Sequence, residues 1–176
     1  MKIEAAFRPL RELERNLAEL YGSWAEAFED NREAAFVFFK MATEEKGHAA
    51  LIDYARRFVQ KDPSLGGDID VDLSRVRETS DRIRVFRESG ETPSLEKALE
   101  IALEFEEKAA ESHYRTALKQ MNPEMERLLQ FLGSADEQHV DRLKEFSAKL
   151  KRPSRITKRS PAKTTSPVTG FHFRPR

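Results

Sequence analysis

Residues 38–59 read FFKMATEEKGHAALIDYARRFV, and this stretch decides the fold class. Apolar side chains recur in it every three or four residues, which is the spacing of one face of an α-helix. Glu45 and His48 interrupt that face at the same depth. The sequence therefore predicts a bundle helix whose buried side holds an acid and an imidazole. The two rows of this face are Phe38, Glu45, Ile52, Val59 and Ala34, Met41, His48, Ala55.

The rest of residues 1–150 has the same helical character, with few Gly and Pro and many Ala, Leu, Glu, Lys and Arg. We expect one helix over 9–29 and a second that is capped at Asp30-Asn31 and runs to 61. Thr92-Pro93 and Asn122-Pro123 are helix-start signals, with Pro at the first helical position of a third and a fourth helix. The fourth helix should end near Lys151.

Short links join the first helix to the second and the third to the fourth, so each pair should form an antiparallel hairpin. Residues 62–91 are a longer crossover whose second half could form a short amphipathic helix. Its DIDVD run lacks the Gly and the Glu of a calcium loop, and we interpret it as a solvated connector. The fold class predicted for 1–150 is an all-α antiparallel four-helix bundle.

The fourth predicted helix repeats the pattern of the second. ADEQHVDRL (135–143) places Asp136 and His139 three residues apart, inside rows of large apolar side chains. Burying an unpaired carboxylate is costly, so each of these acids needs a partner. The two rows are Met125, Leu132, His139, Phe146 and Leu129, Asp136, Leu143, Leu150.

The first and third predicted helices supply matching acids. Glu14 lies seven residues before Tyr21, and Glu107 lies seven residues before Tyr114. Seven residues is nearly two helical turns, so each Tyr shares a face with its Glu. Glu104, one turn before Glu107, is an alternative on the same face, and the choice between the two stays open.

Several carboxylates and two imidazoles in one dry core would repel each other as anions unless cations neutralised them. Two divalent iron or manganese ions would do so and would use every one of these side chains as a ligand. An acid and a His three residues apart point to one side of a helix, as a shared dinuclear site requires. The alternative is a plain bundle in which these groups form buried salt bridges.

Three motifs make residues 8–150 resemble the rubrerythrin branch of the ferritin-like superfamily: EEKGHA (44–49), SLEKALEIALEFEEKA (94–109) and ADEQHVDRL (135–143). The resemblance implies a non-haem di-iron centre that reacts with peroxide or dioxygen. It implies that Glu104 is an additional carboxylate and that Tyr21 and Tyr114 form hydrogen bonds near the site. The metal ligands implied are Glu14, Glu45, His48, Glu107, Asp136 and His139.

The chain departs from this family in two respects. It has no cysteine, which excludes disulfides, thiolate metal sites and a catalytic thiol, whereas rubrerythrins proper carry a cysteine-bound iron that feeds electrons to the di-iron site. We therefore expect an external electron donor. Asp136 stands where the family has Glu, which shortens that ligand by one methylene. By resemblance we also expect a homodimer or a larger assembly.

Three functions are compatible with these residues. The first is a di-iron oxidoreductase that reduces hydrogen peroxide. The second is a ferroxidase or iron-handling protein, and manganese or zinc could replace iron in either. The third is a metal-free helical module that binds a partner.

The neutral total charge divides near Leu150. Residues 151–176 carry eight basic and no acidic side chains, so residues 1–150 have a net charge of −8. We expect this Pro- and Ser-rich tail to be disordered. It could bind nucleic acid or an acidic partner, or direct the chain into a protein nanocompartment as cargo. With no membrane-length apolar run and no secretory signal, a cytoplasmic location is expected.

Overall fold

The computed structural model describes residues 2–68, 73–112 and 123–151, apart from the side chains of 108–112, 124, 126 and 128–137. Nearly all of this part of the chain is helical, and an isolated bridge joins Lys2 to Asp68. The elements are α1 (Glu4–Ala27), α2 (Arg32–Lys61), a 3₁₀ turn (Pro63–Leu65), α3 (Leu73–Glu88), α4 (Leu95–Ser112) and α6 (Pro123–Leu150).

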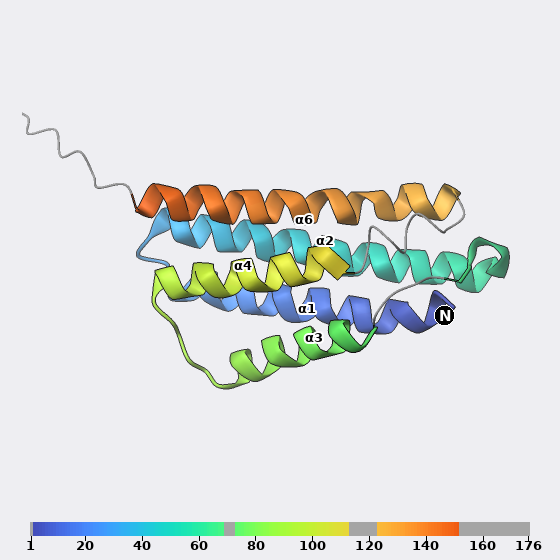
Figure 1. The fold of residues 1–176 in the computed structure, drawn as a ribbon, viewed down its shortest axis with the longest axis horizontal. Helices are drawn as coiled ribbons and strands as arrows, with labels where there is room; N and C mark the ends of the chain where they lie inside the picture. Colours follow the sequence, from blue (N-terminus) through green and yellow to red (C-terminus); the bar gives the residue numbers. More distant parts are fainter. Residues whose placement is uncertain (1, 69–72, 113–122, 152–176) are drawn as a thin grey trace, which may run out of the picture.

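Four long helices, α1, α2, α4 and α6, lie side by side along the length of the molecule (Figure 1). α2 packs against α1 and α6, and α4 packs against α6. α3 lies outside this set and packs against α1 and α4. The predicted all-α, ferritin-like bundle is confirmed, and the amphipathic helix expected in the crossover is α3.

The start of α2 agrees with the prediction, but the start of α4 does not. The Asn31 side chain accepts a hydrogen bond from the backbone N–H of Ala34 (3.1 Å), which caps α2. At α4 the cap is not Thr92, and Pro93 does not lie in the first turn. The hydroxyl of Ser94 accepts from the Lys97 N–H (3.3 Å). The carbonyl of Ser94 accepts the first helical bond, from the Ala98 N–H (2.8 Å).

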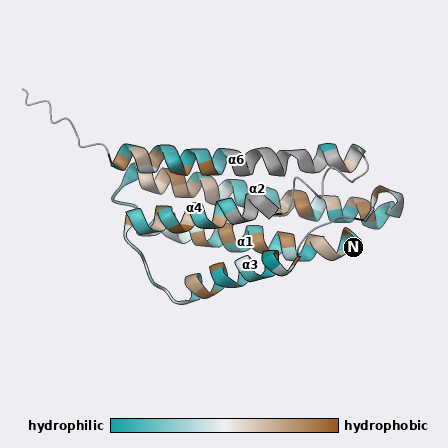
Figure 2. Ribbon diagram, viewed as in Figure 1, coloured by the Kyte–Doolittle hydropathy of each residue, from teal (hydrophilic) through white to brown (hydrophobic). Residues whose placement is uncertain are grey.

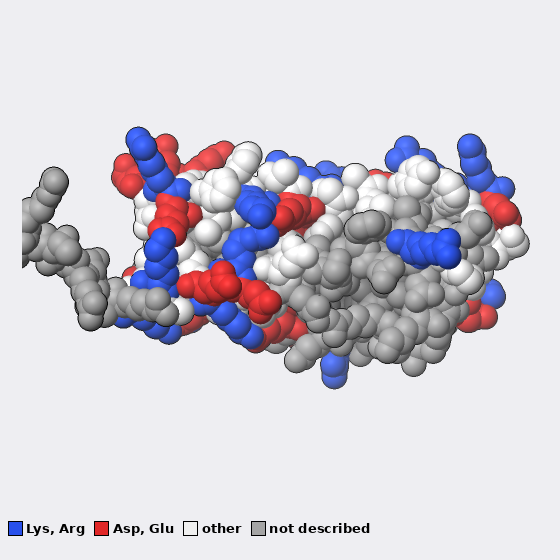
Figure 3. Space-filling view, turned by 90° about the horizontal axis from the view of Figure 1, so that it is seen from above, with Lys and Arg blue, Asp and Glu red and all other residues white. Residues whose placement is uncertain are grey.

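The buried side chains form one continuous core between the helices. Trp24 of α1 packs edge-on against Phe38 of α2, with ring centroids 5.3 Å apart, and against Phe86 of α3 at 5.9 Å. Figure 2 shows hydrophobic and hydrophilic residues alternating along the helices, as expected where one side of each helix is buried. On the face that carries α6, Lys and Arg lie next to Asp and Glu (Figure 3).

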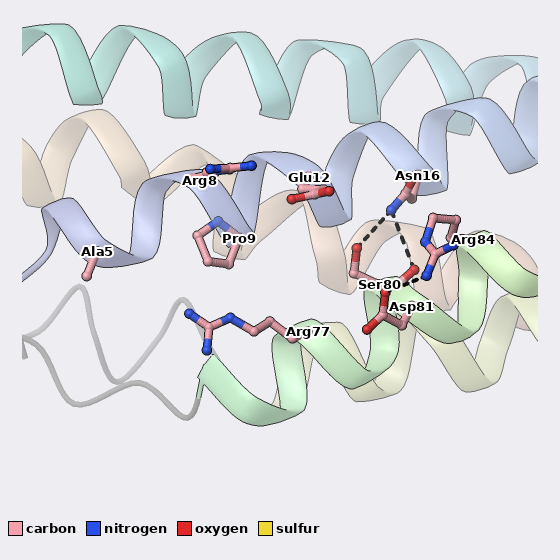
Figure 4. Close-up of a pocket in the computed structure, with 9 residues that line it drawn as sticks. All are labelled: Ala5, Arg8, Pro9, Glu12, Asn16, Arg77, Ser80, Asp81 and Arg84. Carbon is pink, nitrogen blue, oxygen red and sulfur yellow. Dashed lines mark hydrogen bonds and ion pairs between the residues drawn. The ribbon is translucent and has the colours of Figure 1, made fainter.

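A buried polar contact ties α3 to α1. The Asn16 side-chain amide donates to the Ser80 hydroxyl (2.8 Å) and reaches the Ser80 carbonyl oxygen at 3.5 Å (Figure 4). Both residues are buried. Beside this contact, Arg8 of α1 and Arg77 of α3 border a surface hollow of about 360 Å³ (Figure 4). No helix among the described residues has an apolar segment that could cross a bilayer.

The expected tail at 151–176 and the DIDVD run at 68–72 lie almost wholly outside the described residues, which include Asp68 and Lys151. Asp68 forms an exposed ion pair with Lys2 (3.0 Å). α6 ends at Leu150, close to the predicted end of the fourth helix.

The contact between Asn16 and Ser80 can be tested by a double-mutant cycle. Asn16→Ala should lower the free energy of unfolding by about 1–3 kcal/mol, because the buried Ser80 hydroxyl loses its partner. Adding Ser80→Ala should cost little more, since no unpaired polar group then remains. Urea unfolding followed by circular dichroism measures all three variants. Strictly additive losses would contradict a direct contact between the two side chains.

Candidate metal centre

Four helices bring five buried polar residues together in the middle of the bundle. α1 supplies one, α2 supplies two, and α4 and α6 supply one each. Their exposed fractions are between 0 and 8%, so the group is shielded from water. The residues are Glu14, Glu45, His48, Glu106 and His139.

These residues form two groups that share Glu45. In the first group, Glu14, Glu45 and His48 each place one ligand atom within 4.8 Å of the others. In the second, Glu45, Glu106 and His139 do the same. The two imidazole rings are stacked, with centroids 5.5 Å apart and planes 25° apart. The arrangement offers two candidate metal positions, with Glu45 between them.

Distances between the atoms support this description. The Nδ1 of His48 lies 2.9 Å from Glu45 Oε2 and 3.7 Å from Glu14 Oε2. The Nδ1 of His139 lies 2.9 Å from Glu45 Oε1 and 3.3 Å from Glu106 Oε2. Each ring thus directs the same nitrogen at a pair of carboxylates, which is where a bound cation would sit.

The residues also fit a metal chemically. Glu45 Oε1 is buried and accepts no hydrogen bond of good geometry, although His139 is near. An orphaned carboxylate oxygen in a dry core is costly, and a cation would satisfy it. Three carboxylates with two imidazoles are ligands that suit iron, manganese and zinc.

Without a metal, protons provide the positive charge. Burial by itself would lower the pKa of His48, but hydrogen bonds and charges from Glu14 and Glu45 outweigh it and raise that pKa to about 10. Burial likewise opposes protonation of His139, yet Glu106 and Glu45 raise its pKa to about 11. Both imidazoles are therefore cationic at neutral pH.

The same charges act on the carboxylates. Burial, followed by the charge of Glu45, raises the pKa of Glu14 to about 7. Burial and the charge of Glu106 would also raise the pKa of Glu45. The close contacts with His139 and His48 reverse that effect and lower the pKa of Glu45. Glu45 therefore stays ionised between the two rings.

Tyr21 holds the carboxylate that comes from α4. Its hydroxyl donates to Glu106 Oε1 at 2.6 Å, and the ring is fully buried. Burial, and then the negative charge of Glu106, raise the pKa of Tyr21 well above its usual value. The hydroxyl therefore keeps its proton and fixes the orientation of Glu106, with Glu106 Oε2 on the His139 side.

Glu44, which the sequence analysis missed, orients His139 from the side of the ring that faces away from the cluster. Glu44 Oε2 lies 3.1 Å from His139 Nε2, the nitrogen that does not face the cluster. Arg142 holds Glu44 with two bonds of 2.5 and 3.2 Å, and these outweigh the effect of burial and lower the pKa of Glu44. A carboxylate behind a metal-binding imidazole is a common arrangement. The feature of the sequence that could have pointed to Glu44 is its position directly before Glu45, which makes two consecutive glutamates.

The structure corrects the inward position predicted for Glu104 and Glu107. Both are exposed: Glu104 pairs with Arg82 of α3 (2.8 Å) and Glu107 with Lys144 of α6 (3.0 Å). Glu106 occupies the position expected of them. The reason is the phase of α4, whose buried residues between 95 and 107 are Ala98, Leu99, Ala102, Phe105 and Glu106.

One signal could have identified Glu106. It lies seven residues after the buried Leu99, as Glu45 lies seven residues after Phe38. Two other predicted site residues fall outside what the structure describes. Asp136 lies in α6, but its side chain is not described, and Tyr114 belongs to the segment 113–122.

A comparison with known protein families agrees with a metal-binding cluster at this place in the bundle. The family model described as Rubrerythrin matches residues 12–147, a range that contains all five residues of the cluster. No curated protein and no solved structure matches the chain significantly.

The raised pKa values predict how the stability of the metal-free protein depends on pH. His48 and His139 contribute stability that is complete below their unfolded pKa of 6.5 and is lost as pH rises through about 10 and 11. The melting temperature of chelator-treated protein should therefore fall between pH 7 and pH 10. The His48→Gln/His139→Gln variant should show a flatter profile. A melting temperature of the unsubstituted protein that rises over this range would contradict the assignment.

Proposed function

This chain belongs to the rubrerythrin family, and on that premise we propose that it is a non-haem di-iron protein that reduces hydrogen peroxide. The observation that carries the proposal is the sharing of Glu45 by two Glu–His groups in the bundle core. The electrons come from an external donor, since the chain has no cysteine with which to hold an additional, rubredoxin-type iron.

The residues divide into two sets of ligands and one bridge. Glu14 and His48 would hold one iron, and Glu106 and His139 the other. Glu45 would bridge them through its two oxygens, which face different imidazoles. Asp136 remains a further ligand proposed from its sequence position.

Two ferrous ions bound there would supply the two electrons that, with two protons, convert one hydrogen peroxide molecule to two water molecules. The chain's own residues position this chemistry. Tyr21 fixes Glu106, and Glu44 with Arg142 fixes His139, so one iron position is supported from two sides. The low exposure of all five cluster residues keeps bulk water away.

Adjacent glutamates on α4 provide a sharp test of the ligand set. Glu106→Gln should reduce bound iron well below the two ions per chain expected of the unsubstituted protein, because it removes an anionic ligand. Glu107→Gln, a matched change at an exposed neighbour, should leave the iron content unchanged. Metal analysis after anaerobic loading with Fe(II) measures both. Equal iron in the two variants would contradict the role of Glu106.

The reaction is tested with the loaded protein. Anaerobic ferrous protein is mixed with equal doses of hydrogen peroxide or dioxygen, and iron oxidation is followed by absorbance. Much faster oxidation by peroxide supports peroxide reduction, whereas net mineralisation of added iron would indicate a ferroxidase instead. Less than one iron or manganese per chain after reconstitution would overturn both and leave a metal-free module.

Metal binding should also release protons. His48 and His139 carry protons at neutral pH, and an imidazole must lose its proton to ligate through Nδ1. Glu14, whose pKa is raised to about 7, is partly protonated as well. Filling both positions near pH 7 should therefore release between two and three protons per chain, and overall affinity should rise by at least about a hundredfold per pH unit between pH 6 and 8. A pH indicator in weakly buffered solution measures the release. Metal uptake without it would contradict ligation by these two rings.

A further inference from the structure

Arginine side chains line the groove between α1 and α3. Two surface hollows lie along it, one of about 360 Å³ and one of about 310 Å³. The hollows adjoin, and we call the depression that they form the α1–α3 groove. Four lining residues are common to both hollows: Arg8, Glu12, Asn16 and Arg84. Six arginines line the groove in all, namely Arg8, Arg11 and Arg15 of α1 and Arg77, Arg84 and Arg87 of α3.

The arginines of each helix lie on the face that borders the groove. Arg8 and Arg15 are seven residues apart on α1, and Arg77 and Arg84 are seven residues apart on α3, which is nearly two helical turns. α3 runs in the same direction as α1 (Figure 1). Arg8 and Arg77 line the first hollow together, and Arg15 and Arg87 line the second. In Figure 4, Arg77 extends from α3 toward α1. Cations from two helices therefore border the same space.

Half of these arginines have no acidic partner. Arg8, Arg15 and Arg77 form no ion pair with any residue that the structure describes. Glu12, which lies between Arg8 and Asn16 in Figure 4, has no such pair either. Three unpaired positive charges therefore border the groove against one unpaired negative charge. The other three arginines are held in ion pairs: Arg11 with Asp53 (3.2 Å), Arg84 with Asp81 (3.0 Å) and Glu88 (3.2 Å), and Arg87 with Glu19.

The spacing of the two rows of arginine is fixed by a buried contact. Asn16 and Ser80 lie at the junction of α1 and α3, and the hydrogen bond between their side chains ties the two helices together there. The unpaired guanidinium groups are thus carried by helices whose relative position is set before any ligand arrives. Such preorganisation lowers the entropic cost of binding.

The kind of basic residue also points to an anion. All eight basic residues of α1 and α3 are Arg, whereas α2 and α6 carry both Arg and Lys, and α4 carries only Lys. A guanidinium group donates two parallel hydrogen bonds to a phosphate, whereas an ammonium group acts as a point charge. Residues 1–150 have a net charge of −8, so an excess of unpaired arginine at one groove runs against the charge of the rest.

We propose that the α1–α3 groove binds a small anion that carries a chain of phosphate groups. Arg8 and Arg15 are about 10 Å apart along α1, so a single phosphate would contact only one end of the row. A chain of phosphates can contact arginines of both hollows and can neutralise all three unpaired guanidinium groups. Inorganic polyphosphate and the phosphate chain of a nucleotide share this chemistry. None of the groove residues belongs to the metal cluster, so binding needs no iron.

The first test measures binding of tripolyphosphate to the metal-free full chain by isothermal titration calorimetry. Arg8→Gln/Arg77→Gln should weaken the tight site at least about tenfold, because two charged hydrogen-bond donors are lost. Both residues are exposed and outside any ion pair described above, so the fold should persist, and melting temperatures check this. Arg32→Gln/Arg57→Gln, the same change of charge at exposed positions of α2, should leave the affinity unchanged. Equal affinities of the two double variants would overturn the proposal.

A substitution that improves binding gives a second test. Glu12→Gln removes the unpaired carboxylate from the groove, so tripolyphosphate should bind about threefold more tightly. Orthophosphate should bind at least about tenfold more weakly than tripolyphosphate, because it contacts fewer of the arginines. Citrate carries similar charge on carboxylates instead of phosphates. If citrate binds as tightly as tripolyphosphate, the assignment to a phosphate chain is wrong.

The basic residues beyond Leu150 require their own control. Residues 151–176 carry eight basic side chains, which also attract phosphates. A full-length variant with these eight residues replaced by Gln should keep the tight site. Loss of the site in that variant, with retention in Arg8→Gln/Arg77→Gln, would place the anion on residues 151–176 and overturn the proposal.

A comparison of tripolyphosphate with adenosine triphosphate distinguishes the two sources of a phosphate chain. Tighter binding of the nucleotide supports a site that also contacts the sugar or the base. Equal or tighter binding of tripolyphosphate supports a site for inorganic polyphosphate. If neither binds to the metal-free chain, the proposal is overturned.

Discussion

The rest of the structure depends on one buried carboxylate held between two imidazoles. Glu45 directs one oxygen at His48 and the other at His139, each at 2.9 Å. An ionised carboxylate in a dry core is unfavourable by several kcal/mol unless such partners neutralise it. Because His139 comes from α6, the pairing fixes the height of α2 relative to α6. The hydrophobic core alone would tolerate small shifts along the helix axes, but this contact does not.

Neighbouring polar residues hold the partners of this central contact in place. Tyr21 and Glu106 link α1 to α4, and Glu44 with Arg142 adds a second link between α2 and α6. All three of these contacts join a helix of the first hairpin to a helix of the second, so the polar network connects the two hairpins across the interior of the bundle. This explains why the site is preorganised before any cation binds. The protons of His48 and His139 supply the positive charge that the proposed metal ions would otherwise supply.

The sequence predicted the parts of the site that lie in strongly apolar rows. Glu45, His48 and His139 interrupt rows of Phe, Met, Ile and Leu, so their buried positions could be recognised and the structure brings them together. Glu106 was missed because four glutamates occur within eight residues of α4 and its buried row is partly built from alanine. Alanine fits both buried and exposed positions, so the sequence only weakly indicates which face of α4 is buried.

Other features depend on tertiary contacts that no helical periodicity encodes. Ser94 and Thr92 are both good capping residues, and only the packing of α4 decides between them. Glu44 looks like an exposed acid in sequence, since it adjoins the buried row without belonging to it. Its role depends on Arg142, ninety-eight residues later, on another helix. An ion pair at the edge of a buried helix face, such as that of Glu44 with Arg142, can therefore be recognised only in the three-dimensional structure.

α2 carries Glu45, the carboxylate that both candidate metal groups share. One residue along a helix corresponds to about 1.5 Å, whereas metal ligands must lie within about 0.2 Å of their ideal distances. Small movements of α2 would therefore disturb both groups that share Glu45. α1 and α6 restrain this helix from the inside.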